Sequence, residues 1–211
     1  MILAIDGAST DLSIALASAD GDQIADESWT SAQRQSAELL PRVLELLRSS
    51  DRKLQELTAL AVGTGPGSFT GLRVAMALAK GLALALQRPI VGVPSLLAWL
   101  EQEPEASAAV ARAGAREAYV LTHGAEGPII VERDQVAGRL AGRRIVAPRE
   151  LVEAFELTDA RPPAAGPALA RLAAGRLAAD PAGDDLRIME PIYLRAPRGL
   201  AAAPEGQVRW L

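Results

Sequence analysis

Short apolar runs alternate with polar turns at the start of the chain, and this pattern predicts three consecutive strands. Residues 2–6 are apolar up to Asp6, and residues 12–17 alternate large and small side chains, as a half-buried strand does. Asp20-Gly21 is a hairpin signal, after which residues 23–29 return as a third strand. The chain is therefore expected to open with a β-β-β unit with tight connections.

A helix, a strand and a second helix are predicted next, at residues 36–50, 57–62 and 70–87. A helix with one buried face needs an apolar arc of about 100°. The first helix has a wider one, made of Leu39, Leu40, Val43, Leu44, Leu46 and Leu47. This excess predicts two contacts for the helix, one with its own sheet and one elsewhere.

Small residues recur every four positions on the second helix, at Gly71, Ala75, Ala79 and Ala83. Small side chains at this spacing allow another helix to approach closely. Burial against the sheet of its own domain explains the same pattern, and both interpretations remain open. A fifth strand at 89–93 and a helix that opens at Pro94-Ser95 and runs through Leu100 complete the first half.

A polar segment at 101–107 divides the chain, and the pattern then partly recurs. Four further strands are predicted at 108–112, 117–122, 129–133 and 144–147. Two further helices are predicted at 148–155 and 167–179, before a last extended run at 186–194. The sequence thus predicts a duplicated α/β fold with a first domain at 1–103, a smaller degenerate domain at 104–198 and a C-terminal tail at 199–211.

The turn between the fourth strand and the second helix, GTGPGSFTGLR at 63–73, invites a nucleotide-binding hypothesis. The P-loop pattern requires a Lys that this turn lacks, and G-x-G-x-x-G is not completed. A close-packing turn that uses glycine for geometry alone is the simpler interpretation. Ser68 or Thr70 is positioned to cap the helix that follows.

Composition narrows the possible chemistry. The chain has 211 residues. Its net charge of −4 and pI near 5.2 argue against binding of a nucleic-acid phosphate backbone by this chain alone. With no Cys and a single His, His123, it has no thiolate zinc site and no pair of His ligands. Residues 1–6 predict a strand instead of a signal peptide. The sequence contains no run of eighteen apolar residues, so no membrane-spanning helix is predicted. We expect a cytoplasmic protein.

Several single residues have both a structural and a functional interpretation. Asp6 is either a turn former at a strand end or a group that orients a metal-bound phosphate. Arg73 lies near the positive end of a helix dipole, where a positive charge is unfavourable. Its presence there favours a specific contact with a phosphate or a partner carboxylate. Lys80 is either an interface charge or a solvated side chain. Tyr193 and Arg195 are expected to pack the last extended run onto the first domain.

Five stretches together resemble the TsaB family, and they extend over most of the chain. They are Ile2-Leu3-Ala4-Ile5-Asp6, Ser36-Ala37-Glu38-Leu39-Leu40-Pro41, Gly65-Pro66-Gly67-Ser68-Phe69-Thr70-Gly71-Leu72-Arg73, Ala79-Lys80-Gly81-Leu82-Ala83 and Pro191-Ile192-Tyr193-Leu194-Arg195. The third stretch is the most specific to the family. The resemblance implies two ribonuclease H-like lobes of the actin, sugar kinase and Hsp70 type, the second smaller and degenerate.

The resemblance also implies a role. TsaB resembles a degenerate paralogue of TsaD, the subunit that transfers the threonylcarbamoyl group to tRNA, and it pairs with TsaD while the ATPase TsaE joins them. This implies a non-catalytic subunit with no cofactor of its own, since ATP and a divalent metal belong to the partner subunits. It also implies homodimers in the absence of TsaD, contact with tRNA only through the complex, and no membrane association.

In the family the pairing surface is built from the first two helices, so the resemblance implies a partner-binding set on them. The set is Ser36, Leu39, Leu40, Val43, Leu47, Arg73, Ala75, Met76, Ala79 and Lys80. The motif loop is Gly65, Pro66, Gly67, Ser68, Phe69, Thr70 and Gly71.

Two other functions are less compatible with the sequence. A phosphotransferase of the sugar or acetate kinase type needs an acidic base and a phosphate loop in each half. Asp6-Gly7 offers one such loop, but no glycine-rich turn follows 108–112. A peptidase is the least favoured, because the chain has no metal-binding motif.

Overall fold

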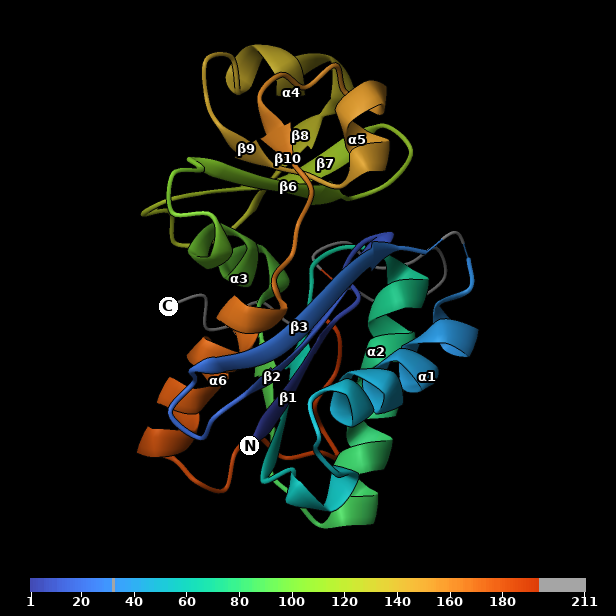
Figure 1. Cartoon of the computed structure of the whole chain (residues 1–211). Helices are drawn as coiled ribbons and strands as arrows, with labels where there is room; N and C mark the ends of the chain where they lie inside the picture. The colour runs from blue at the N-terminus through green and yellow to red at the C-terminus, as the bar shows by residue number, and fades with distance from the viewer. Residues whose placement is uncertain (32, 194–211) are drawn as a thin grey trace.

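A computed structural model gives the structure of the chain for residues 1–31 and 33–193. Two five-stranded sheets form two lobes, one above the other in Figure 1. The strands are β1 (Ile2–Asp6), β2 (Asp11–Ala17), β3 (Gln23–Thr30), β4 (Ala59–Gly63), β5 (Ile90–Val93), β6 (Ala108–Arg112), β7 (Glu117–Thr122), β8 (Ile129–Glu132), β9 (Ile145–Val146) and β10 (Ala160–Arg161). The helices are α1 (Gln35–Ser49), η1 (Leu54–Glu56), α2 (Phe69–Leu86), α3 (Ser95–Gln102), α4 (Arg133–Arg139), α5 (Arg149–Ala154) and α6 (Gly166–Ala179).

The two sheets share one topology, which confirms the predicted duplication. The first has the order β3-β2-β1-β4-β5 and the second β8-β7-β6-β9-β10. In each, the first three strands pair antiparallel and the last two join parallel to the first strand's free side. The second lobe is the smaller, since β9 and β10 have only two residues each.

Alternating side chains place helices on both faces of the first sheet (Figure 1). Leu3 and Ile5 of β1 join the core beneath α1 and α2, whereas Ile2 and Ala4 join the core beneath α3 and α6. The face toward α6 is rich in alanine, from Ala4, Ala15, Ala17, Ala59 and Ala61. These small residues let α6 lie close to the sheet, and its first amide, at Gly166, donates to the hydroxyl of Ser13 at 2.9 Å.

The return of α6 to the first lobe is the main departure from the sequential order. Residues 166–179 fall within the predicted second domain, 104–198, yet they pack on β1 and β2. The domain boundaries themselves remain predictions, and the tail at 199–211 lies outside the described residues.

One local prediction was wrong, and three short elements, η1, β10 and α4, were not predicted. The segment 186–194 was predicted to be extended, but its described part begins with a turn at 186–188 and joins no sheet. It contacts the first lobe through single bonds, such as the one that Ile192 N donates to Thr64 O. The two-residue strand β10 was not predicted, and it pairs with β9. The missed helix, α4, has one buried apolar residue, Val136, and therefore no apolar periodicity to detect.

The lobes are joined by a buried carboxylate. Asp11 of β2 is 4% exposed, and its Oδ2 accepts the amide of Arg149, the first residue of α5, at 3.0 Å. Pro148 precedes α5 and has no side-chain oxygen to cap it. Asp11 therefore acts as an N-cap supplied by the other lobe, which fixes α5 against the first sheet.

Candidate functional site

The glycine turn packs against the turn that follows β1. A Cβ on Gly71 would lie 2.2 Å from the carbonyl oxygen of Gly7, so only glycine allows these backbones to touch. Ser68 N donates to Ala8 O at 2.6 Å, and Ser68 Oγ accepts the amide of Gly71 at 3.3 Å. Ser68 is thus the N-cap of α2, and the geometry supports the close-packing interpretation of the turn.

Asp6 is enclosed by α3. Its Oδ1 accepts from Ser95 Oγ and its Oδ2 from Trp99 Nε1, both at 2.7 Å, and the side chain is 1% exposed. Burial raises the pKa of Asp6, and the bonds from Trp99 and Ser95 oppose that rise in part. Ser95 Oγ also accepts the amide of Gly65, which ties the motif loop to the same group. Both carboxylate oxygens are occupied, so Asp6 holds the fold together and has no open face toward a phosphate.

Trp99 was not identified from the sequence, although a signal exists. Ser95 and Trp99 are four residues apart on α3, so both side chains lie on the same face of the helix. A hydroxyl and an indole N–H at this spacing offer two donors to one acceptor. The sequence alone does not show that the acceptor is Asp6, which lies about ninety residues earlier.

Most of the predicted partner-binding side chains face their own core. Six of the ten are at most 4% exposed: Leu39, Val43, Leu47, Ala75, Met76 and Ala79. All six belong to the core cluster beneath α1 and α2. The expectation that they form a surface is corrected, because a side chain buried in its own subunit cannot contact a second protein. The small-residue stripe of Gly71, Ala75, Ala79 and Ala83 is likewise buried against the sheet.

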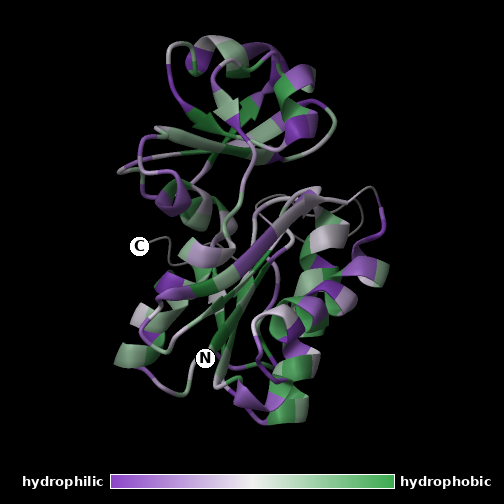
Figure 2. Cartoon of the chain, viewed as in Figure 1, coloured by the Kyte–Doolittle hydropathy of each residue, from purple (hydrophilic) through white to green (hydrophobic). Residues whose placement is uncertain are grey.

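The two helices nevertheless leave some apolar residues exposed. Figure 2 shows hydrophobic residues along both helices. On α1 the exposed ones include Leu40 at 40% and Leu44 at 44% exposure, and on α2 Leu84 at 71%. We call this surface the α1–α2 face and define it by its exposed residues Leu40, Pro41, Leu44, Ala77, Gly81 and Leu84. Of the predicted set, Leu40 lies on it, Ser36 is exposed one turn before Leu40, and Arg73 and Lys80 flank the α2 side.

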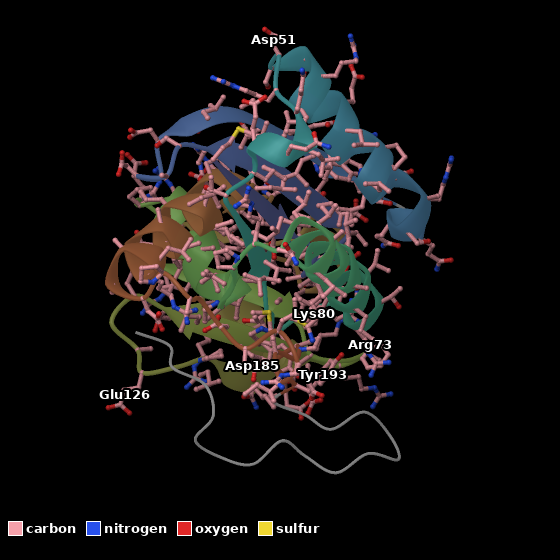
Figure 3. The ribbon with its side chains drawn as sticks, turned by 90° about the horizontal axis from the view of Figure 1, so that it is seen from below. Asp51, Arg73, Lys80, Glu126, Asp185 and Tyr193 are labelled. Atoms are coloured by element: carbon pink, nitrogen blue, oxygen red, sulfur yellow. The ribbon has the colours of Figure 1, made fainter. Side chains whose placement is uncertain are left out.

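Arg73 joins the motif loop to the end of the described chain. Its guanidinium lies 3.9 Å from the ring centroid of Phe69, and its Nε donates to the hydroxyl of Tyr193 at 3.0 Å. The rings of Phe69 and Tyr193 are 5.4 Å apart. Figure 3 shows Arg73 and Tyr193 together near Lys80 and Asp185. The expected packing of Tyr193 onto the first lobe is confirmed, while Arg195 lies outside the described residues.

The surface of the described chain has at least two cavities. One, of about 580 Å³, lies beside the motif loop and is lined by Thr10, Gln33, Gln35, Ser68 and Thr70. The other, of about 600 Å³, lies in the second lobe between α4 and α5 and is lined by charged residues that include Arg116, Arg133 and Asp134. Neither includes Asp6. Within residues 1–31 and 33–193, no cluster of three or more His, Cys, Asp or Glu is arranged to hold a metal ion.

One helix among the described residues, α2, is long and apolar enough to cross a membrane by length and composition alone. It packs on β4 and β1, and a third of its length is buried there. Length and composition of one helix are weak evidence for a membrane span, because helices of folded lobes meet the same criterion.

The chain matches a family of tRNA-modification proteins over more than half of its length, and individual members of that kind over a shorter region. The family model described as "TsaD: tRNA N6-adenosine threonylcarbamoyltransferase" matches residues 30–174. The tRNA threonylcarbamoyladenosine biosynthesis protein TsaB of Escherichia coli K12 is 39% identical over 97 residues, which is 46% of this chain and 41% of that protein. The TsaB protein of Bacillus subtilis is 41% identical over 95 residues, 45% of this chain and 41% of that protein. The chain belongs to the TsaB family.

The matched region thus spans 41% of the length of each of these TsaB proteins. A solved structure described as YeaZ from Pseudomonas aeruginosa matches this TsaB-family chain with a TM-score of 0.68 and 28% identity. That match covers 92% of this chain and 99% of the other. The fold of two ribonuclease H-like lobes, the second smaller, is therefore as the resemblance implied.

Proposed function

We propose that the chain is a non-catalytic subunit of the machinery that forms threonylcarbamoyladenosine in tRNA, and that it binds TsaD through the α1–α2 face. The observation that carries the proposal is the outer side of α2. Beyond Arg73, the residues Ala77, Gly81 and Leu84 follow one another there at helical spacing, all exposed and none charged. A helix that remained in water would carry charged or polar residues on this side.

Gly81 adds a second argument for a close partner. It lies inside an 18-residue helix, where glycine costs about 0.5–1 kcal/mol relative to alanine. No atom lies within 4 Å of the position that a Cβ would take, so the fold itself does not require glycine here. Ala77 and Ala85 are exposed four residues to either side. A helix from another subunit that crosses α2 at Gly81 would need this small surface.

The non-catalytic part of the proposal is supported by Asp6. A kinase of this fold needs a carboxylate that reaches its phosphate groups, whereas Asp6 is held by Ser95 and Trp99. In the proposed complex ATP and a divalent metal are bound by the partner subunits, and tRNA is contacted through the complex. In the absence of TsaD, the α1–α2 face is expected to pair two copies of the chain.

The experiment reconstitutes the complex from this chain, TsaD and TsaE of the same organism, and assays tRNA modification with each component omitted in turn. Modification should require the chain, and the chain alone should transfer no threonylcarbamoyl group from its adenylate to tRNA. Transfer by the chain alone would overturn the non-catalytic role. Full modification in its absence would overturn the role in the pathway.

A matched pair of variants tests the surface. Leu44→Glu places a charge on the α1–α2 face, and Ile130→Glu places a charge on β8 of the other lobe. The two side chains are equally accessible, with Leu44 44% and Ile130 43% exposed. Leu44→Glu should abolish co-elution with TsaD in size-exclusion chromatography, whereas Ile130→Glu should leave it intact. Both should melt like the wild type, because neither side chain is buried. Co-elution of Leu44→Glu with TsaD at the wild-type level would refute the surface.

A further inference from the structure

We infer that Arg73 is a preorganised receptor for a carboxylate of the protein that docks on the α1–α2 face, and that Tyr193 positions it. The inference rests on the proposed function and names a contact within it. It assigns one role to two sequence stretches, the motif loop and the end of the described chain, which are far apart in sequence.

The guanidinium of Arg73 is held from two directions. The ring of Phe69 lies 3.9 Å from the guanidinium carbon, and the hydroxyl of Tyr193 accepts from Nε at 3.0 Å. Phe69 is in turn packed against Tyr193 at 5.4 Å between ring centroids. A free arginine side chain loses rotamer entropy when it binds, and this arrangement restricts it before a partner arrives.

The donors that remain point to an anion. A guanidinium has five N–H groups, and the bond to Tyr193 uses only the one on Nε. The terminal nitrogens of Arg73 bond to no group among the described residues, and no carboxylate there pairs with it. Asp185, which lies on the same side of the molecule, is bonded to Arg187, and this bond holds the pKa of Asp185 below its usual range. The free fork of Arg73 fits the two oxygens of a carboxylate.

The position of Arg73 identifies the source of that carboxylate. Arg73 is exposed one helical turn before Ala77, at the edge of the α1–α2 face (Figure 3). Protein interfaces have an apolar centre and a polar rim, and arginine is enriched in them. An RNA phosphate is the other candidate anion, but the net charge of the chain is −4 and a phosphate backbone would be repelled. The acidic side chain of a docked protein is therefore favoured.

The test measures the affinity of the full chain for TsaD, first with three single variants. Arg73→Ala should weaken binding about tenfold or more, because arginine is among the residues whose loss costs most at protein interfaces. Arg73→Lys should recover only part of the loss, because lysine keeps the charge but lacks the fork. Arg143→Ala is the control, since Arg143 is exposed in the second lobe with no ion pair among the described residues. It should bind as the wild type does.

The role of Tyr193 is tested by a double-mutant cycle. Tyr193→Phe keeps the ring against Phe69 and removes the hydroxyl that holds Nε, so it should weaken binding a few-fold. In the Arg73→Ala background the same change should have no effect, because the group it positions is gone. An equal loss in both backgrounds would show that Tyr193 acts independently of Arg73 and would overturn its positioning role.

The remaining outcomes separate this inference from the proposed function. If wild type binds TsaD, Leu44→Glu does not and Arg73→Ala binds normally, the docking face stands and the carboxylate receptor is refuted. If wild type fails to bind TsaD, both are refuted. Binding of tRNA to the chain alone at physiological salt, abolished by Arg73→Ala, would assign the fork to phosphate and overturn the carboxylate.

Discussion

Asp6 accepts a hydrogen bond at 2.7 Å from the indole nitrogen of Trp99, and this bond joins the end of β1 to α3. Trp99 is fully buried, so the carboxylate has no path to solvent on that side. The buried carboxylate at the end of β1 therefore contributes to the stability of the fold.

The first prediction concerns the stability that Asp6 provides. Asp6→Asn keeps one acceptor but puts an NH₂ group opposite the donor of Ser95 or Trp99. A buried donor that loses its partner costs about 1–3 kcal/mol, so the free energy of unfolding should fall by that amount. Urea unfolding at neutral pH measures it. An unchanged midpoint would show that the two bonds add nothing.

The second prediction concerns pH. Because the pKa of Asp6 is raised in the folded chain, the folded state binds the proton more tightly than the unfolded state. The contribution of Asp6 to stability is then greatest below the unfolded pKa near 3.8 and declines as pH rises through the folded pKa. Asp6→Asn cannot titrate, so the stability advantage of the wild type over the variant should shrink between pH 4 and neutrality. Unfolding of both proteins across that range tests the sign, and a growing advantage would contradict it.

The third prediction compares two adjacent leucines on α1. Leu39 is 1% exposed within the core and Leu40 is 40% exposed on the α1–α2 face. Leu39→Ala should lower the free energy of unfolding by about 2–5 kcal/mol, and Leu40→Ala by about 0.5 kcal/mol or less. The order should reverse for TsaD binding among variants that remain folded. Equal unfolding costs would mean that α1 is rotated from its described orientation.

The fourth prediction compares two glycines on α2. Gly71→Ala would place a Cβ 2.2 Å from the carbonyl oxygen of Gly7, and we expect it to destabilise the chain by about 1–3 kcal/mol. Gly81→Ala meets no atom within 4 Å and should stabilise the isolated chain by about 0.4–1 kcal/mol. It should at the same time weaken pairing, if a second backbone crosses there. Thermal melts measure the change in stability, and the affinity for TsaD measures the change in pairing. Stronger pairing of Gly81→Ala would argue against a close crossing of helices.

The fifth prediction concerns the bond between the lobes. Asp11→Ala removes the N-cap of α5 and the acceptor of the Thr30 hydroxyl, at a cost of about 1–2 kcal/mol. The amides of the first turn of α5 should then exchange hydrogen faster, which mass spectrometry of deuterated peptides can localise. Asp20→Ala, at an exposed hairpin turn, is the control. Unchanged exchange in α5 would show that the lobes are held without this cap.

The strand and helix order was predictable because periodicity is a local property. β1, β6 and β7 begin and end where the pattern predicts, since strong apolar runs meet clear turn residues. Which side of α1 is buried was not predictable in the same way. Apolar residues such as Leu39 and Leu40 lie on both sides of the helix, and only the packing of the sheet decides between them.

The candidate site was predictable only in part. The motif loop and the two helices were identified, but the contact of Arg73 with Tyr193 joins residues 120 positions apart and leaves no local pattern. The burial of Asp6 by Trp99 has the same character, because Asp6 ends β1 whereas Ser95 and Trp99 lie on α3, about ninety residues later. Residues whose role depends on such distant contacts require the structure.

The packing of α6 on the first sheet has a consequence for synthesis on the ribosome. The alanine-rich side of the first sheet, with Ala4 and Ala61, is covered largely by α6, which ends at Ala179. A nascent chain that has emerged only to residue 103 lacks α6, so α3 is the one helix available to cover the alanine-rich side of its sheet. The upper lobe has to be translated before the lower one can close, so the first lobe to begin folding is the last to finish.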